Sequence, residues 1–493
     1  MRKRFEQQTN LSLVPIKDAA IPLKYRDGLP AVLLALQYVF TTPTLSENIF
    51  SLLETKITSG KKNTGRTGMD LWHILVLGVV RHVFNFDWDA LVMEANYNSL
   101  VRMVLGVHPT GFLDYKDTTT FCYQTIRDNV KHLDEDLLRK INLLLVNAGH
   151  GLVQKEKDAP LYLKTDSFVA ERNVHFPSDL GLMWDSSRKS LDMVQKLASE
   201  SGLTGWRKVS DIKKTFKKLQ RRTAQAVRNC KDDKKKVQSV KEYLESAQKI
   251  IDRIQDVVNG VDATKESLNK KAKMAFEELK KYHAYMVMFS DQIRRRLIDG
   301  EIIPHIEKIF SIFEEDVEWI TKGKSNKPVE LGHLELITTD QYQFIVDYHT
   351  MYKEKDAPQV PDLCKRLKTN FGDVRIKGIS FDKGFFSKDN AKELAKAGFT
   401  ESTLPKRGRH TKEDKEREGT DEFKKRRNAH SAIESNINML EHHGLCKCMD
   451  KGKEGFKRYV GLSVMAYNLH RIGNILKARE LKKQQKAQRK RAA

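Results

Sequence analysis

The spacing of apolar residues predicts a helical region over residues 46–153. Leu71, Ile74, Leu75 and Val79 recur at three- and four-residue intervals, and similar intervals follow as far as residue 153. Short helices with tight connectors are typical of helix-turn-helix-like DNA-binding domains, although a helical domain without that role fits the periodicity equally well. Residues 1–45 contain four prolines, which break long helices, and they are predicted to be an N-terminal arm.

Two predicted strands each end at an aspartate. Residues 161–166 (LYLKTD) alternate apolar and polar positions up to Asp166, and an apolar strand over residues 374–381 is followed by Asp382. In open α/β sheets, side chains just past the carboxyl ends of strands line ligand sites. Each aspartate can equally be a solvated strand end or a turn residue. The company of other acidic residues favours a site.

Residues 187–315 are predicted to be almost entirely helical and rich in lysine. One face carries Ile212, Phe216 and Leu219, and a row of cations at four-residue spacing lies on another face, formed by Lys213, Lys217 and Arg221. Apolar residues from 240 to 258 continue a coiled-coil-like seam. The cations indicate either a solvated face or contact with the DNA backbone, and the seam is a candidate dimer interface.

The α/β pattern returns over residues 316–475. Strands are predicted within residues 328–337 and 343–348, and a helix over residues 360–371 precedes the Asp382 strand. A later helix, over about residues 421–441, carries His430 and Glu434 one turn apart on the same face. Residues 476–493 form a basic tail that is predicted to be disordered when free.

Charge points to a polyanionic partner. Lys and Arg number 88 against 65 Asp and Glu, a formal charge of +23, which favours nucleic acid over an acidic small molecule. No apolar stretch approaches the roughly 20 residues of a membrane span, and the N-terminus has no secretory signal pattern. Five cysteines, an odd count, indicate a reducing compartment, and we expect a cytoplasmic protein. Cys446 and Cys448 beside two histidines lack the usual zinc-ligand spacing.

Asp166, Asp382 and Glu434 place three carboxylates on one α/β domain. Carboxylate oxygens suit Mg²⁺ or Mn²⁺, and two such ions roughly 4 Å apart support in-line displacement at phosphorus. A basic chain would supply the contacts to a phosphodiester substrate.

Several stretches, taken in order, resemble the DDE transposases of bacterial insertion sequences, and an ISNCY-like group among them. These stretches are GRTGMDLWHILVLGVVRHVFNFDWDALVMEA, LKTDSFVAERNVHFPSDLGLMWD, WITKGKSNKPVELG, ISFDKGFFS, RRNAHSAIESNINMLEHHGL and GLSVMAYNLHRIG. They run from about residue 65 to residue 473, so nearly the whole chain is involved. Each stretch is loosely similar by itself, but the ordered set is specific.

The resemblance implies an α/β fold with large all-α parts. An RNase H-like catalytic domain (154–186 and 316–475), with a mixed sheet flanked by helices, would be interrupted by a helical, coiled-coil-like insertion (187–315). A helical DNA-binding domain (46–153) would precede it. The metal ligands and catalytic residues would be Asp166, Asp382 and Glu434, with Mg²⁺ or Mn²⁺, two ions, as cofactor. Related transposases place Tyr and Arg before the Glu and Lys after it; here those positions hold Arg427, His430 and Glu441.

The expected function is binding of terminal inverted repeats, cleavage of element ends and transfer of 3′-hydroxyls to target DNA by a homodimer or larger assembly, in the bacterial cytoplasm on the nucleoid. The residues expected to contact DNA are Lys61, Lys62, Arg66, Lys213, Lys217, Arg221, Arg426, Arg427 and His430. A metal-dependent RNase H-like nuclease and a catalytically inactive, transposase-derived DNA-binding protein are the alternatives. A strand-transfer assay distinguishes the nuclease from a transposase, because the nuclease leaves no joined product. The inactive protein would bind the end sequences undiminished after Asp382→Ala and would show no metal-dependent cutting in either form.

Overall fold

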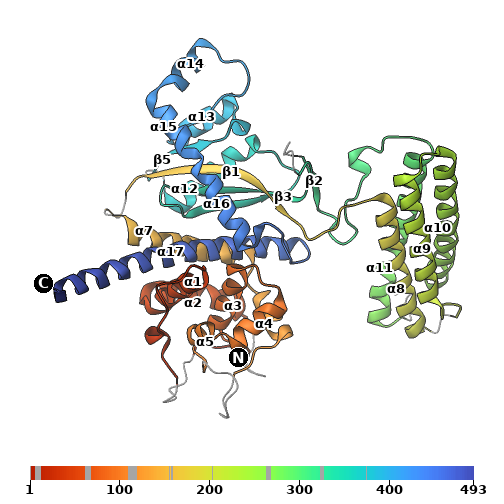
Figure 1. Cartoon of the computed structure of the whole chain (residues 1–493), viewed down its shortest axis with the longest axis horizontal. Coiled ribbons are helices and arrows are strands. Elements are labelled where there is room, and N and C mark those ends of the chain that lie inside the picture. The colour runs from red at the N-terminus through yellow and green to blue at the C-terminus, as the bar shows by residue number, and fades with distance from the viewer. Residues whose placement is uncertain are drawn as a thin grey trace. The chain divides into compact units, whose positions relative to one another are not determined.

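A computed structural model describes residues 2–5, 13–60, 68–108, 119–154, 156, 159–201, 204–262, 268–321, 327–372 and 375–492. The chain divides into two compact units. The first, unit 1, combines Met1–Asn173 with Ile320–Ala493, and the second, unit 2, is Val174–Trp319 (Figure 1). Among the described residues, no single helix is long and apolar enough to cross a membrane; two helices over residues 29–57, bent by 91°, pass that test only as a pair.

Unit 1 begins with a set of helices that share one apolar core with the sheet. They are α1 (Leu29–Thr41), α2 (Pro43–Ile57), α3 (Leu71–Val83), α4 (Trp88–Tyr97), α5 (Ser99–Leu105), α6 (Tyr123–Val130) and α7 (Glu135–Val153), after the short 3-10 helix η1 (Ile16–Asp18). A single cluster of buried side chains runs from Ile16 through these helices to the strands. The helical region is therefore packed as one body with the sheet, whereas the sequence predicted a separate domain.

The prediction of an arm over residues 1–45 is wrong for α1. Eight residues of this helix are buried, and α1 packs along the last helix of the chain. Pro30 and Pro43 were interpreted as helix breakers, but each lies in the first turn of its helix. Proline is well tolerated there, because the first backbone N–H groups of a helix have no intrahelical acceptor.

The described residues form a sheet of five strands of mixed direction, all in unit 1 except the short β2 at the boundary between the units. They are β1 (Leu161–Glu171), β2 (Glu318–Ile320), β3 (Glu330–Thr339), β4 (Ile345–Met351) and β5 (Ile376–Phe381). Their order is β2-β3-β1-β5, and β4 also pairs with β3. β3 runs antiparallel to β1 and β4, while β5 runs parallel to β1. A mostly helical protein with a mixed sheet among its helices is consistent with an RNase H-like domain.

The remaining helices of unit 1 pack on this sheet or extend from it. They are α12 (Val360–Phe371), α13 (Lys388–Lys396), α14 (Lys412–Gly419), α15 (Asp421–His430), α16 (Ala432–Leu440) and α17 (Lys453–Ala492), with the 3-10 helices η4 (Ala357–Gln359) and η5 (Lys383–Phe385) and the π-helix η6 (Glu441–Leu445). Figure 1 shows α16 crossing one face of the sheet and α7 lying along α17.

The basic tail is helical in the structure. Residues 476–493 were predicted to be disordered, but α17 continues as one helix to Ala492. This stretch is rich in Lys, Arg, Gln, Ala and Leu, which are good helix formers. From Lys482 to Arg491 its residues are exposed, so the helix end is not held by packing.

Unit 2 is a helical bundle with its own apolar core. Its helices are α8 (Asp179–Ser201), α9 (Val209–Asn229), α10 (Asp233–Asp262) and α11 (Lys270–Leu297), followed by the 3-10 helix η3 (His305–Glu307). The seam over residues 240–258 is buried inside this bundle, with Val240 and Ile254 at 1% and 0% exposure. The interpretation of this seam as a dimer interface is therefore wrong, because α8, α9 and α11 of the same chain already cover it.

Candidate active site

Asp166 and Asp382 occupy equivalent positions on neighbouring parallel strands. Thr165 of β1 is paired in register with Phe381 of β5, and each aspartate is the next residue in its chain. Asp382 has extended backbone angles (φ −75°, ψ 165°), so the chain continues in the direction of the strand through this residue. Adjacent strands lie about 5 Å apart, and residues aligned across them project from the same face. The register therefore puts both carboxylates side by side on one face of the sheet.

The two aspartates differ in their local surroundings. Asp166 is half-buried, and its Oδ1 accepts a hydrogen bond of 2.7 Å from the backbone N–H of Ser167. Asp382 is exposed at the start of η5, and its side chain does not cap that helix. The alternative interpretation of Asp382 as a helix-capping residue therefore has no support in the structure.

Glu434 lies on the helix that crosses this face. It is exposed in the first turn of α16, which contacts β1, while Ile433 and Leu440 on the same helix are fully buried against the sheet. The predicted single helix over residues 421–441 is divided at Ser431, so that His430 ends α15 and Glu434 lies in the first turn of α16. His430 is held to the sheet, because its Nδ1 is 3.0 Å from the Oγ of Ser380 on β5.

His430 is within electrostatic range of both Asp382 and Glu434. Burial is the largest influence on its pKa and lowers it, while the carboxylates of Asp382 and Glu434 act to raise it. The ammonium group of Lys164 also lowers the pKa of His430. These interactions show that Lys164, Asp382, His430 and Glu434 share one small region over the middle of β1 and the end of β5.

The carboxylates have the right chemistry to bind a divalent cation, but they are not arranged around a common point. Carboxylate oxygens are the ligands that Mg²⁺ prefers, and Asp166 and Asp382 emerge together from neighbouring strands. Within the described residues, however, no group of three or more His, Cys, Asp or Glu side chains converges on a metal-binding arrangement. Like charges repel one another, so a preformed cluster of three carboxylates is unfavourable without a cation. Cys446 and Cys448, which are among the described residues, are not part of such an arrangement either.

A small cavity lies next to the carboxylates on the same face. Its volume is about 120 Å³, and it lies between β1, β5, the segment around residue 403 and α15. Its lining includes Tyr162, Lys164, Ser380 and Arg426. The guanidinium of Arg426 lies 5.8 Å from the centre of the Tyr162 ring and forms an ion pair with the carboxylate of Glu401.

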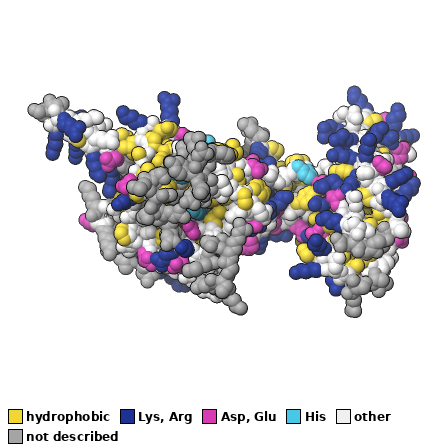
Figure 2. All heavy atoms as spheres, turned by 90° about the horizontal axis from the view of Figure 1, so that it is seen from below, with side chains coloured by type: hydrophobic (Ala, Val, Ile, Leu, Met, Phe, Trp, Pro, Cys, Tyr) yellow, Lys and Arg dark blue, Asp and Glu magenta, His cyan; other side chains and the backbone are white. Residues whose placement is uncertain are grey.

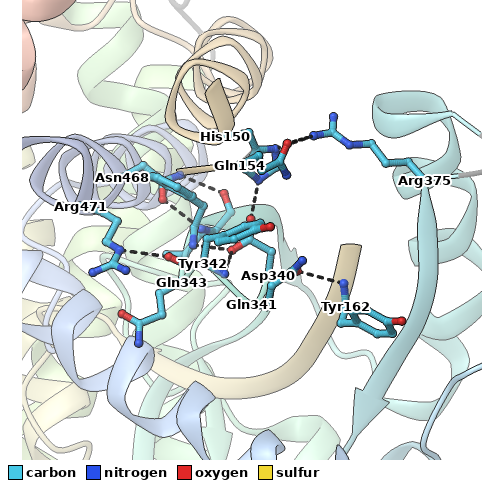
Figure 3. A network of polar contacts seen from close by, with 12 residues as sticks. His150, Gln154, Tyr162, Asp340, Gln341, Tyr342, Gln343, Arg375, Asn468 and Arg471 are labelled. Carbon is cyan, nitrogen blue, oxygen red and sulfur yellow. Dashed lines mark hydrogen bonds and ion pairs between the residues drawn. The ribbon is translucent and has the colours of Figure 1, made fainter. Parts of the chain in front are cut away.

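The turn between β3 and β4 forms a fixed wall of this region (Figure 3). The Oδ1 of Asp340 accepts hydrogen bonds from the backbone N–H groups of Tyr342 and Phe344, at 2.8 and 2.9 Å. Its Oδ2 lies 2.6 Å from the Nε2 of the buried His150 on α7. Arg375 donates to the Nδ1 of His150 at 3.1 Å, which leaves the proton on Nε2, facing Asp340.

The same turn is tied to β1 and α17. The side-chain amide of Gln341 accepts a hydrogen bond from the backbone N–H of Tyr162, at 3.0 Å, and donates one to the carbonyl of Pro160, at 2.8 Å. Arg471 of α17 donates to the carbonyl of Tyr342 at 3.0 Å, as Figure 3 shows. These contacts fix the start of β1, and therefore the strand that carries Asp166.

The described residues among those predicted to contact DNA lie in two places. Arg426 and His430 border the carboxylate face, and Arg427 is exposed beside them. Lys213, Lys217 and Arg221 lie on α9 in unit 2. Lys61, Lys62 and Arg66 lie outside the described residues.

The cations of α9 are not equivalent. Lys217 and Arg221 are exposed, whereas Lys213 is half-buried and forms an ion pair with Asp192 of α8. Residues 207–236 contain 13 Lys and Arg against three Asp and Glu, so the charge is concentrated on α9 and the start of α10. Figure 2 shows Lys and Arg side chains gathered over the surface of unit 2.

Lys164 and Ser380 were not assigned to the site from the sequence. Each of them precedes an aspartate by two residues, Lys164 before Asp166 and Ser380 before Asp382. Residues two apart on a strand share a face. The alternation that predicted the strand ending at Asp166 therefore already contained the signal for Lys164 and Tyr162.

Comparison with known proteins identifies part of the chain. Residues 291–469 match the family model described as "Transposase DDE domain". The matched range contains Asp382 and Glu434, while Asp166 precedes it. No match was found among curated proteins or among solved structures.

Proposed function

We propose that this chain, whose residues 291–469 are a transposase DDE domain, is the transposase of a mobile DNA element. The domain belongs to a catalytic family, so the chain is an enzyme with DNA as its substrate. The finer proposal is that it binds the terminal inverted repeats of its element, cleaves the element ends and joins the freed 3′-hydroxyls to target DNA. A bacterial insertion sequence, and a cytoplasmic, nucleoid-associated location, are part of this proposal.

The observation that carries the proposal is the placement of three acidic residues on one face. Asp166 and Asp382 each follow one residue of a register pair, Thr165 of β1 and Phe381 of β5. Glu434 lies on the helix over the same face. In the proposed mechanism, Asp166, Asp382 and Glu434 would hold Mg²⁺ or Mn²⁺ for phosphodiester chemistry.

Bound Mg²⁺ or Mn²⁺, two ions in the family's chemistry, would activate the attacking oxygen and stabilise the leaving oxygen at phosphorus. The residues of the chain have separate tasks around that step. Asp166 and Asp382 present carboxylate oxygens from a rigid sheet, and Glu434 presents a third carboxylate from α16. In both cleavage and joining, a new P–O bond forms to water or to a DNA 3′-hydroxyl while another P–O bond breaks, and no covalent protein intermediate is needed.

The basic surfaces supply contacts to the DNA backbone in this proposal. Lys217 and Arg221 on α9 and the exposed end of α17 are suited to phosphates and carry no information about base sequence. Handling two element ends together calls for a homodimer or a larger assembly. The surface that would join the copies is not the seam over residues 240–258, because that seam is buried within unit 2.

The test uses DNA fragments labelled at the inverted repeats that flank the gene, incubated with the purified protein and Mg²⁺. We expect cuts at the repeat boundary and joined products. Asp382→Ala should lower cleavage by at least about 1,000-fold, because it removes a ligand from a metal site that lowers the activation barrier by several kcal/mol. Asp382 is exposed, so this variant should fold normally.

Asp389→Ala is the matched control, since Asp389 is an exposed aspartate on the nearby helix α13. It should cleave as the wild type does. Cutting without joined products would instead identify a nuclease. Binding of the repeats without metal-dependent cutting, in both the wild type and Asp382→Ala, would identify an inactive DNA-binding protein and contradict the proposed activity.

A further inference from the structure

The cavity beside the carboxylates lies along the same faces of β1 and β5 as the proposed catalytic residues. Tyr162, Lys164 and Asp166 alternate along β1 and therefore share one face. On β5, Gly378 is paired with Tyr162 and Ser380 with Lys164, so the two strands form a common floor that leads to Asp166 and Asp382. At about 3.3 Å per residue, Lys164 is about 7 Å and Tyr162 about 13 Å from Asp166 along the strand.

The size of the cavity suits one ring-shaped group. Its volume is about 120 Å³, which is similar to cavities that hold a single benzene-sized molecule. A Cβ atom at Gly378 would lie 2.3 Å from the carbonyl oxygen of Glu401, so glycine is required for the segment around Glu401 to pack this closely against β5. That packing forms one wall of the cavity, and Arg426 and Ala429 of α15 form another.

Tyr162 presents an aromatic surface at the edge of this cavity. It is 38% exposed, although it lies on a strand whose neighbouring residues Leu161 and Leu163 are buried. Arg426 lies over its ring, and Glu401 holds the guanidinium in place by an ion pair and by accepting a 2.9 Å hydrogen bond at its backbone carbonyl. The ring and the guanidinium are therefore fixed before any ligand arrives.

Lys164 adds a positive charge between Tyr162 and the carboxylates. Its Nζ lies 3.4 Å from the backbone carbonyl of Asp340, and no carboxylate of the described residues forms an ion pair with it. The Asp340 carboxylate interacts with this ammonium group only at longer range, and burial is the larger influence on its pKa and lowers it. A half-buried ammonium group without a direct ion pair, on the floor that leads to Asp166, is suited to an anionic ligand.

We propose that this cavity is a subsite for the DNA strand next to the scissile phosphate, in which Tyr162 stacks on a nucleobase and Lys164 contacts a backbone phosphate. The inference rests on the proposed function, since it names the part of the substrate that this face holds. A nucleotide combines the two features that the cavity offers, a flat ring and an adjacent negative charge. Stacking on an aromatic side chain tolerates any base, so the subsite positions the strand without selecting its sequence.

The first experiment measures binding by fluorescence anisotropy in the Asp382→Ala background, so that no DNA is cut. The probe is a labelled element-end DNA with a single abasic position placed, in separate molecules, at each of about five nucleotides on either side of the boundary. Tyr162→Ala should weaken binding of intact DNA by about 5- to 100-fold, and Tyr162→Phe should restore most of it. One abasic position should weaken binding to the Asp382→Ala protein and have no further effect when Tyr162→Ala is also present.

Lys164→Gln should lower the dependence of log K on log salt by about 0.7 to 0.9, as expected for one lost phosphate contact. Two controls match these variants. Tyr25→Ala removes another exposed tyrosine, far along the chain from the site, and Lys377→Ala removes an exposed lysine on the opposite face of β5. Both controls should bind as the parent protein does.

The outcomes separate this inference from the proposed function. Metal-dependent cleavage by the wild type, with Tyr162→Ala and Lys164→Gln cutting and binding normally and no abasic position affected by Tyr162, would overturn the subsite and leave the transposase intact. Loss of binding in these variants, without cutting by any form of the protein, would support the subsite and contradict the catalytic activity. Equal loss in Tyr25→Ala or Lys377→Ala would also overturn the subsite, because the effect would not belong to this cavity.

Discussion

Glu335 is a carboxyl group buried in the middle of the sheet, close to the proposed site. It lies on β3 two residues from Ile337, the partner of Asp166, so it shares a face with that aspartate. It is fully buried, and burial raises its pKa to about 8, although His333 and Arg139 act to lower it. The group is therefore protonated at neutral pH in the folded protein, while it ionises near its ordinary pKa in the unfolded chain.

This difference predicts a pH-dependent stability. Between about pH 4.5 and pH 8 the unfolded state loses the proton and the folded state keeps it, so this group lowers the stability of the wild type progressively as the pH rises. Glu335→Gln, which is neutral at every pH, should raise the free energy of unfolding by about 2 to 3 kcal/mol at pH 7 and leave it nearly unchanged at pH 4.5. Urea unfolding at both pH values measures the effect.

Glu416→Gln serves as the control, because Glu416 is exposed on α14, and its effect should be small at both pH values. A gain from Glu335→Gln of the same size at pH 4.5 and pH 7 would show that the amide improves packing and that the carboxyl group does not titrate as described.

At this scale, the sequence predicted the residues whose positions follow from alternation. Asp166 and Asp382 were singled out because each was predicted to end a strand, and the register confirms that the two strands are neighbours. The predicted end at Asp166 is wrong, because β1 continues to Glu171 by pairing with β3. Glu335 could not be recognised in the same way, because a carboxylate within a strand is usually solvated, and only the packing of α16 and α17 over β3 makes it buried. The ion pair of Lys213 with Asp192 depends in the same way on a contact between two helices.

At the scale of elements, α17 is the helix whose packing the sequence predicted least well. Its middle part is buried between α1, α3 and α7, and its contact with α1 is among the most extensive between helices. Gly473 allows the two helices to approach closely, because a Cβ atom there would lie 1.8 Å from the backbone carbonyl oxygen of Ala31. The missing side chain is thus a packing requirement, although glycine lowers the intrinsic stability of a helix.

Gly473→Ala should therefore destabilise the fold by at least about 2 kcal/mol, because a backbone atom of α1 has to move. Urea unfolding of the full chain gives the measurement. In the same helix, Gly455→Ala meets its nearest atom, the Cβ of Asp450, at 3.4 Å, and it should be neutral or stabilising by up to about 1 kcal/mol. Equal stability of the two variants would mean that α1 does not pack against α17 at Gly473.

The boundaries of helices and strands depend on tertiary contacts. The strands within residues 328–337 and 343–348, and the helix over residues 360–371, were predicted close to the observed β3, β4 and α12. The prolines of α1 and α2 gave a false signal, since proline marks either the break or the first turn of a helix. The π-helix η6 at the end of α16 had no signal in the pattern. Gly444 in it has φ 110°, and a Cβ atom there would come close to Asn85 and Tyr459, which are distant in the sequence.

At the scale of the whole molecule, the charge of +23 is distributed unevenly. Residues 207–236 carry a large excess of cations on α9 and the start of α10. Most of these side chains are exposed, and four of them, Lys214, Lys217, Lys218 and Arg221, recur at three- and four-residue spacing on one face of α9. Lys213 is excluded from this set because Asp192 neutralises it. Release of counterions from DNA would make the contribution of Lys214, Lys217, Lys218 and Arg221 depend strongly on salt.

Replacing these four residues together by glutamine should weaken DNA binding at physiological salt and lower the slope of log K against log salt by about 3 to 4, since each phosphate contact contributes about 0.9. Binding to labelled duplex DNA over a range of salt concentrations measures the slope. The matched variant replaces Lys270, Lys271 and Lys273 on α11 and Lys249 on α10, which are exposed in the same unit and change the net charge equally. If α9 contacts the DNA backbone, the first variant loses much more of the slope than the second. Equal losses would mean that the total charge of unit 2, acting at a distance, determines the affinity, and that α9 is not a contact surface.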